Sequence, residues 1–332
     1  MSARALAALL LLLTACQSQG TGSGSASAGG GKEPPDALAE ARQLLAQGQP
    51  DAVLARLQGA GDPDALLLQG QAWAKKAQTA PLPTAPPMAS PAPRGAAPPS
   101  APELKPEELQ AVDFYERAVA ARPDLGAAHL ALAELLGPHA LARVQRSSAS
   151  AKSAAPGRRP GRRSATPEPV PSALPGPDAS PARVLREYRL AAQADPSTAI
   201  VEAWILFATS AGGLDDAEAA MQELVKRIKE RPEPFVRYGD FLLATKKDPE
   251  GAIAQYRQAL IWKADDEAVK AKVADIYLGM AADHLSRHEY SSAEVQIKEA
   301  QKYVANRTSP QGRKLQELQA EVALIRGRPP GR

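Results

Sequence analysis

The residue type with the most specific chemistry in this sequence is cysteine, which occurs once, at position 16. A single cysteine provides neither an internal disulfide framework nor a zinc site with two or four thiolate ligands. Cys16 follows nine apolar residues, Ala5 to Leu13, and the small residues Thr14 and Ala15. Nine apolar residues are too few to cross a bilayer, which takes roughly 20, but they suit the core of a secretory signal. A thiol at a small-residue cleavage site can carry acyl chains that anchor a protein to a membrane.

A second candidate for chemistry is a pair of histidines. His284 and His288 lie four residues apart on a predicted helix, a spacing that can bind a metal ion. Asp283 and Glu289 are near, but no third ligand is obvious, and a polar helix end flanked by tyrosine explains the pair as well. The sequence has no GxxxxGK[ST] loop, no GxGxxG unit after a strand and no HExxH. We therefore expect no catalytic residue, no metal and no cofactor.

A compact basic group occurs in residues 137–181. This segment holds seven Lys and Arg residues against two acids, so it supplies more than the whole net charge of +3. The group itself consists of Arg158, Arg159, Arg162 and Arg163. It could contact anionic headgroups or cell-wall polymers, at about 1 kcal/mol per basic residue, or it could keep a low-complexity linker in solution, which we favour. Nucleic acid is not expected, because of the export signal and because no aromatic residue interleaves the arginines.

The elements that surround these residues are marked out by proline. Residues 77–106 contain 10 of the 31 prolines and residues 137–181 contain 9. Proline interrupts helices and interior strands, so both stretches are predicted to be disordered inserts or polyproline II segments. Residues 17–31 are rich in Gly and Ser and are predicted to form a flexible tether.

Between the inserts, one Ala-rich pattern recurs. A small or apolar residue is followed by a large one at +4, by Ala at +7 and by Pro at +12, as in Ala111, Tyr115, Ala118 and Pro123. Later copies begin at positions 184, 220, 252 and 293, and a weaker one begins at 53. These spacings place small and large residues on one stripe of a helix. A second amphipathic helix precedes each copy, so small residues would let two paired helices approach closely.

The pattern resembles the tetratricopeptide repeat (TPR), a helix–turn–helix unit of 34 residues. The resemblance implies an all-α solenoid of about five or six helix pairs, in which each Pro-rich insert interrupts one repeat between its two helices. A last helix from Ser309-Pro310 would cap the stack. The alternative is a generic Ala-rich helical bundle with chance spacing.

The TPR resemblance also implies a concave groove for a protein partner. The first helices of the repeats would line it with Ile205, Thr209, Val236, Asp240, Leu243, Leu278 and Ala282. Some TPR proteins clamp a peptide carboxylate with lysines and asparagines, but this chain has one asparagine, Asn306. A helix or an extended apolar segment is the expected occupant. Alternatively, these residues only pack one repeat against the next.

The residues Leu13, Thr14, Ala15 and Cys16 resemble the lipobox of bacterial lipoproteins. The resemblance implies cleavage after Ala15, a diacylglycerol thioether on Cys16 and acylation, for example with palmitate, of its new amino group. Gln17 rather than aspartate favours the outer membrane, with the protein facing the periplasm.

Together, these patterns predict six segments. They are a signal peptide (1–15), a tether (16–33), N-terminal repeats (34–136) with insert 77–106, a basic insert (137–181), C-terminal repeats with a capping helix (182–326) and a tail (327–332). The predicted protein is a lipid-anchored, non-catalytic scaffold that binds a protein partner in the bacterial envelope, similar to pilotins or outer-membrane assembly components. The alternative is a cell-wall-associated regulator whose basic insert contacts peptidoglycan or a cell-wall synthase.

We predict that Cys16→Ala releases the protein from membranes, because it removes the only thiol that can carry a lipid. Fractionation of cells with detection of the protein in membrane and soluble fractions measures the effect, and Ser18→Ala is the matched control. A variant that stays in the membrane fraction would show that Cys16 is not the anchor.

Overall fold

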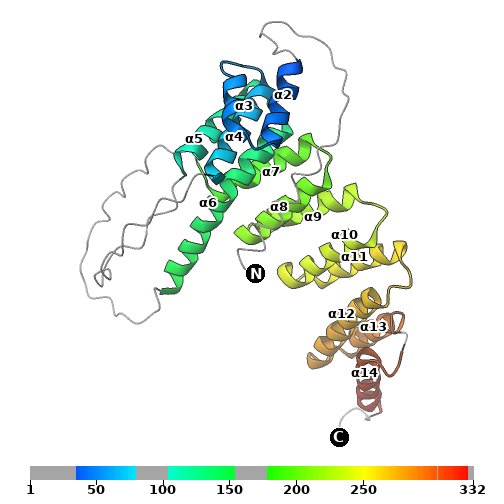
Figure 1. Cartoon of the computed structure of the whole chain (residues 1–332). Helices are drawn as coiled ribbons and strands as arrows, with labels where there is room; N and C mark the ends of the chain where they lie inside the picture. Colours follow the sequence, from blue (N-terminus) through cyan, green and yellow to red (C-terminus); the bar gives the residue numbers. More distant parts are fainter. Residues whose placement is uncertain (1–34, 80–103, 154–177, 305, 328–332) are drawn as a thin grey trace, which may run out of the picture. The chain divides into compact units, whose positions relative to one another are not determined.

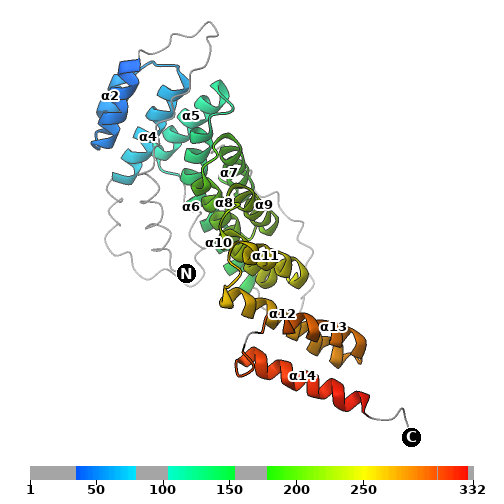
Figure 2. The ribbon, with the colours of Figure 1, turned by 90° about the vertical axis from the view of Figure 1, so that its right-hand side faces the viewer.

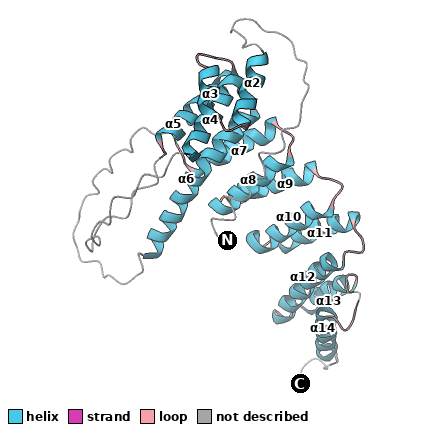
Figure 3. Cartoon of the chain, in the orientation of Figure 1, coloured by secondary structure: helices cyan, strands magenta, loops and turns pink. Residues whose placement is uncertain are grey.

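The computed structural model describes residues 35–79, 104–153, 178–304 and 306–327, and within these ranges every regular element is a helix (Figure 1; Figure 3). The predicted signal peptide, Cys16, the tether and the basic group Arg158, Arg159, Arg162 and Arg163 lie outside the described residues. The chain divides into two compact units, unit 1 (Met1–Gly213) and unit 2 (Leu214–Arg332). Both units are built from paired helices, so the predicted all-α, TPR-like fold class is confirmed.

Unit 1 holds the helices α2 (Pro35–Ala46), α3 (Pro50–Arg56), α4 (Pro63–Thr79), α5 (Pro106–Ala121), α6 (Gly126–Ser153), α7 (Pro181–Ala194) and α8 (Thr198–Ala211). α4 pairs with α5, and α6 pairs with α7 (Figure 1). α2 and α3 pack beside α4, and α8 packs on α6 and α7. Each of the two main pairs joins helices that are separated in the sequence by a Pro-rich stretch.

Unit 2 holds α9 (Leu214–Arg227), α10 (Pro232–Phe241), the π-helix η2 (Leu242–Lys246), α11 (Pro249–Trp262), α12 (Glu267–Ser286), α13 (Tyr290–Gln301) and α14 (Pro310–Arg326). α10 pairs with α11 and α12 pairs with α13 (Figure 2). α14 packs on α12 and α13 through Leu315, Leu318 and Val322, which are buried. The predicted last helix therefore covers the end of this stack.

Short polar side chains begin several of these helices. Ser180, Asp248 and Ser309 each accept a hydrogen bond from the backbone N–H three residues later, and each is followed by proline in the first turn. Such caps satisfy N–H groups that have no partner within the helix, and proline lacks an N–H that would need one. The helix start predicted at Ser309-Pro310 is confirmed.

Glycines opposite tyrosines set the closeness of two helix pairs, one in each unit. A Cβ atom placed on Gly70 of α4 would lie 2.5 Å from the ring of Tyr115 in α5. A Cβ on Gly239 of α10 would lie 2.7 Å from the ring of Tyr256 in α11. Both tyrosines are buried. The ring of one helix therefore rests on the backbone of the other, which is the small-against-large packing that the repeat pattern predicts.

The π-helix η2 absorbs one additional residue in unit 2. In the pair α12 and α13, Ala281 and Ile297 take the places that Gly239 and Tyr256 take in the pair α10 and α11. Ala281 and Ile297 are 16 residues apart, whereas Gly239 and Tyr256 are 17 apart. A π turn accommodates a single inserted residue within a helix. Lys246, at its end, contacts Asp215 and Glu218 of α9 at 2.7 and 2.9 Å. The insertion is thus resolved locally, and the tyrosine still meets the glycine.

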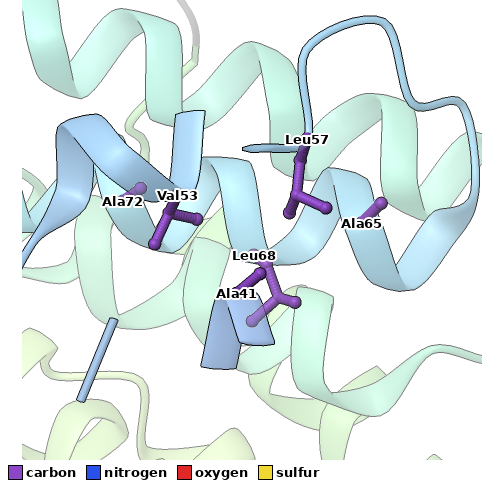
Figure 4. Close-up of a cluster of buried hydrophobic side chains, with 6 residues drawn as sticks. All are labelled: Ala41, Val53, Leu57, Ala65, Leu68 and Ala72. Atoms are coloured by element: carbon purple, nitrogen blue, oxygen red, sulfur yellow. The ribbon is translucent and has the colours of Figure 1, made fainter. Parts of the chain in front are cut away.

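A small apolar cluster joins the first three helices of unit 1. Its buried members are Ala41 of α2, Val53 of α3, the adjoining Leu57, and Ala65, Leu68 and Ala72 of α4 (Figure 4). Leu54 and Ala60 are partly buried against it. The cluster fixes the short helix α3 and the turn that follows it onto one face of α4.

The predicted start of the second insert at residue 137 is wrong. α6 continues through Pro138 to Ser153. Proline removes one backbone hydrogen bond from a helix, which costs about 3 kcal/mol, but packing on both sides of Pro138 supports this helix. Leu136 and Ala140 are buried, and His139 Nε2 lies 3.3 Å from Glu108 Oε2 of α5. A local rule on proline misses these tertiary contacts.

The first insert is also shorter than predicted. α4 extends to Thr79 with Ala77 buried, so helix covers the first three of residues 77–106. The two ends of the stretch lie together, because Lys105 Nζ donates to the Ala77 carbonyl oxygen at 2.8 Å. The second insert does not separate compact units, since α6 and α7 pack together across it and the boundary falls at Gly213.

We predict that Gly239→Ala lowers the free energy of unfolding by up to about 2 kcal/mol, because overpacking against Tyr256 costs roughly 1–3 kcal/mol and alanine recovers about 1 kcal/mol of helix propensity. Gly279→Ala is the matched control, since a Cβ there meets nothing within 4 Å and the variant should be up to about 1 kcal/mol more stable. Urea denaturation followed by circular dichroism measures both. Equal effects at the two glycines would contradict the close approach.

Candidate partner-binding cleft

A cleft of about 520 Å³ opens on unit 1 beside the pair α4 and α5. Its lining comes from α3 (Leu54, Ala55), the following turn (Gln58, Gly59, Ala60, Gly61), α4 (Gln69, Trp73) and α5 (Phe114, Arg117). This volume lies within the range of ligand-binding clefts, roughly 300–1,000 Å³. None of these residues belongs to a motif that marks a site in the sequence.

The cleft exists because little side-chain material covers this face of α4 and α5. α3 has only seven residues, and the turn after it contains Gly59 and Gly61. Gly59 has a φ of +80°, and a Cβ on it would meet nothing within 4 Å. A left-handed backbone favours glycine. Gly59 therefore both allows the sharp turn and leaves this wall of the cleft without a side chain.

One wall of the cleft contains a buried donor without a partner. Gln69 is 5% exposed, and among the described residues its Nε2 has no hydrogen-bond acceptor. Leaving a buried donor unsatisfied costs about 1–3 kcal/mol. Native proteins contain few such groups.

Two aromatic rings with cations beside them form the rest of the wall. The Lys76 ammonium lies 4.8 Å from the centre of the Trp73 ring, and the Arg117 guanidinium lies 5.2 Å from that of Phe114. Arg117 is the charged residue in the lining. Its ion contact with Asp113 is 3.7 Å long between largely exposed side chains, so it contributes at most about 1 kcal/mol. The cleft therefore combines apolar and aromatic surface with one weakly paired positive charge.

A second buried polar group, between α6 and α7, is satisfied within the protein. His129 Nδ1 lies 2.7 Å from Glu187 Oε2, and His129 Nε2 lies 2.9 Å from the Pro123 carbonyl oxygen. The Glu187 hydrogen bond raises the pKa of His129. Burial alone would raise the pKa of Glu187, but hydrogen bonds from His129 and Arg186 outweigh burial and lower it. Both ring nitrogens face acceptors, so this pair holds the two helices together and offers nothing to a ligand.

The residues predicted to line a concave groove have different environments. Ile205 and Leu278 are 2% and 0% exposed, so the prediction is wrong for them. Each belongs to the apolar stripe of its helix, as Val201, Trp204 and Ala208 show for Ile205. Thr209, Asp240 and Leu243 are exposed, and Val236 and Ala282 are half-buried. Asp240 accepts hydrogen bonds from Tyr256 and Lys272. Among these five accessible residues, Thr209 belongs to unit 1 and the other four belong to unit 2. A single groove that joins them therefore stays a prediction.

The two histidines considered for metal binding have separate partners. His284 Nδ1 lies 2.6 Å from Glu289 Oε2, and His288 Nδ1 lies 3.0 Å from the Tyr290 hydroxyl. His288 has a φ of +62° just after α12 ends. Within the described ranges, no three His, Cys, Asp or Glu side chains are grouped to hold a metal ion. In the same ranges, none of the helices has the length and apolar composition of a membrane span.

No family model matches this chain, and no curated protein matches it. Similar solved structures include a thermophilic TPR protein of Thermus thermophilus, which is 17% identical and has a TM-score of 0.32 over 73% of this chain and 98% of its own. The C-terminal part of a TPR repeat-containing protein from Cytophaga hutchinsonii is 8% identical, with a TM-score of 0.37 over 94% and 93%. The pilF structure from Pseudomonas aeruginosa is 15% identical, with a TM-score of 0.28 over 83% and 91%. At these low sequence identities and TM-scores, the similar structures assign no partner to this chain.

The helix pairs of the two units define an all-α repeat protein with TPR-like units. The cleft beside α4 and α5 is its candidate functional site.

We predict that Gln69→Leu raises the free energy of unfolding by about 1–3 kcal/mol, because it replaces an unsatisfied buried amide with an apolar group of similar size. Thermal denaturation of the free protein measures the change. Gln222→Leu is the control, since Gln222 is exposed and its Nε2 donates to the Tyr238 hydroxyl at 3.2 Å, so no gain is expected. A loss of stability in Gln69→Leu would show that the amide has a partner in the folded protein.

Proposed function

We propose that this chain is a non-catalytic scaffold that binds a protein partner in the bacterial envelope and is held there by lipid on Cys16. The observation that carries the binding function is the cleft of unit 1, whose lining includes the Trp73 and Phe114 rings and the cation of Arg117. Apolar surface with a few convergent polar groups is typical of binding sites, and aromatic residues and arginine are frequent anchors in protein interfaces.

The anchor and the location are supported by the sequence. Leu13 to Cys16 resembles a lipobox, and the Gly/Ser-rich residues 17–31 would separate the units from the membrane surface. We further propose the outer membrane, facing the periplasm, and a role in assembling or stabilising an envelope complex, as pilotins and outer-membrane assembly components do. This role agrees with a protein whose described part consists of helix pairs and a binding cleft.

Site-specific photo-crosslinking in intact cells of the native host tests the binding function. A benzophenone amino acid replaces Ala55, which is exposed and lines the cleft. The matched position is Ala244, which is exposed in η2 of unit 2. We expect one discrete protein adduct from position 55 and none from position 244. The same adducts at both positions, or none at position 55, would contradict a partner at the cleft.

A second arm separates the scaffold from the cell-wall regulator. Replacing Arg158, Arg159, Arg162 and Arg163 together with glutamine should leave the adduct at position 55 unchanged. If that variant loses the adduct, or if the adduct is with peptidoglycan, the basic segment and not the cleft directs the function.

A further inference from the structure

We propose that His129, Glu187 and the Pro123 carbonyl form a pH-dependent clasp in unit 1, which holds α6 against α7 while His129 keeps its proton and releases as the pH rises above neutrality. None of these residues lines the cleft beside α4 and α5, so the clasp is a property of the fold in addition to the proposed binding function. It follows from the hydrogen bonds of the pair, the charges around it and its burial between two helices.

The hydrogen bonds of His129 require two protons. Its Nδ1 lies 2.7 Å from Glu187 Oε2, and its Nε2 lies 2.9 Å from the Pro123 carbonyl oxygen. A neutral imidazole has one N–H and one lone pair. In the neutral form, one ring nitrogen would therefore present a lone pair to an oxygen, unless Glu187 carried the second proton. The pair in this geometry holds one proton more than a neutral histidine beside a carboxylate.

Charges on α7 decide where that proton lies. Arg186 Nη2 lies 3.0 Å from Glu187 Oε1, and Arg183 Nε lies 3.9 Å from the same oxygen. Positive charges beside a carboxyl group favour its ionised form. Burial alone would raise the pKa of Glu187, but the hydrogen bonds from His129 and Arg186 outweigh burial. His129 is therefore the imidazolium, and both of its N–H groups donate.

Charged groups on the other elements packed against α6 have partners of their own or face water. Glu116 of α5 accepts a hydrogen bond from Arg183 Nη2 at 2.5 Å. Arg122, directly after α5, pairs with Asp64 of α4 at 2.7 Å. Glu202 of α8 is exposed. The carboxylate that faces the His129 ring is thus the one on α7.

The direction of the pH dependence follows from the two pKa shifts. The Glu187 hydrogen bond raises the pKa of His129 above its ordinary value of 6.5, so the folded protein keeps a proton that the unfolded chain releases. This stabilisation is complete below pH 6.5 and is lost as the pH rises through the folded value. The pKa of Glu187 is lowered from 4.5, so its contribution is complete above pH 4.5 and is lost as the pH falls through the folded value. The clasp is closed in mildly acidic solution and opens on the alkaline side.

Burial makes the loss of the proton costly for this helix pair. Both side chains of the clasp are 4% exposed, so water does not readily replace a lost hydrogen bond. α7 buries Val184, Tyr188 and Ala191, and α8 packs on both α6 and α7. A weakened clasp therefore loosens α6 from α7 and uncovers the apolar side of α7. In unit 2, His284 is partly exposed and His288 is exposed, so the same effect is not expected there.

NMR of the ring nitrogens tests the protonation state directly. The purified full-length chain is labelled with ¹⁵N-histidine, and its four histidines are assigned by single substitutions to glutamine. We expect both ring nitrogens of His129 to carry protons at neutral pH, with a titration midpoint above 6.5. In Glu187→Gln the midpoint should fall by about one pH unit or more, because the neighbouring negative charge is removed. A midpoint at or below 6.5 in the parent chain would overturn the proposal.

Hydrogen exchange of the backbone amides tests the clasp itself. Linkage to one proton changes an equilibrium constant by at most about tenfold per pH unit. Between roughly pH 6 and pH 8.5, after correction for the intrinsic pH dependence of exchange, we expect amides of α6 and α7 to lose about tenfold in protection. Amides of α12 and α13 should change less than about twofold. The ratio is taken within each variant, so a general loss of stability cancels.

Three substitutions separate the clasp from other titratable groups of α6. His129→Gln should make the protection of α6 and α7 independent of this change in pH. His139→Gln is the matched control on the same helix, where Nε2 lies 3.3 Å from Glu108 Oε2, and it should behave as the parent chain. Glu134→Gln should also behave as the parent chain, although burial raises the pKa of that carboxyl group.

The contrary results are distinct. A pH effect that persists in His129→Gln, or one that disappears in His139→Gln or Glu134→Gln, would show that His129 is not the controlling group. Equal pH effects in the two units would show that the response is not local to α6 and α7.

Discussion

How closely two paired helices approach each other is the constraint on which the rest of the structure depends. In both units a tyrosine ring rests on the bare backbone of a glycine, Tyr115 on Gly70 and Tyr256 on Gly239. This contact fixes the register of each pair, and the register decides which side chains become buried. The additional residue that η2 absorbs shows how strictly this register is kept. The helix changes locally to a π turn rather than moving Tyr256 away from Gly239.

The candidate site follows from the same contact. Gln69 is the neighbour of Gly70 in the sequence, and Phe114 is the neighbour of Tyr115. Residues next to the pairing positions face the helix that would precede the pair. Because α3 is short and ends in a glycine turn, that face is incompletely covered, and the amide of Gln69 is buried without being satisfied. A repeat that is left incomplete on one side thus leaves an open cleft without any added element.

The sequence predicts the pairing and the fold well, because the small and large residues that make them recur at fixed spacing. It fails where distant contacts override a local rule. Pro138 stays within α6 because Leu136 and Ala140 are buried on either side. Ile205 and Leu278 belong to apolar stripes, so their buried positions could have been read from helical periodicity. Gln69 is the polar residue in the buried run Leu66 to Gly70. A polar residue in such a run is the signal by which the sequence could have marked it.

The pairing of α4 with α5 and of α6 with α7 has a consequence for chain continuity. Each pair is held by direct contacts between its helices, including the Lys105 contact to Ala77 and the His129 contact to Glu187, whose partners are 28 and 58 residues apart in sequence. Closing a loop becomes only slowly more costly with its length, by about 0.6 kcal/mol per doubling. The connections are therefore places where the polypeptide can be cut, lengthened or exchanged between relatives while the helix pairs stay assembled. We therefore expect the helix pairs of unit 1 to stay together after the chain is cut within either connection.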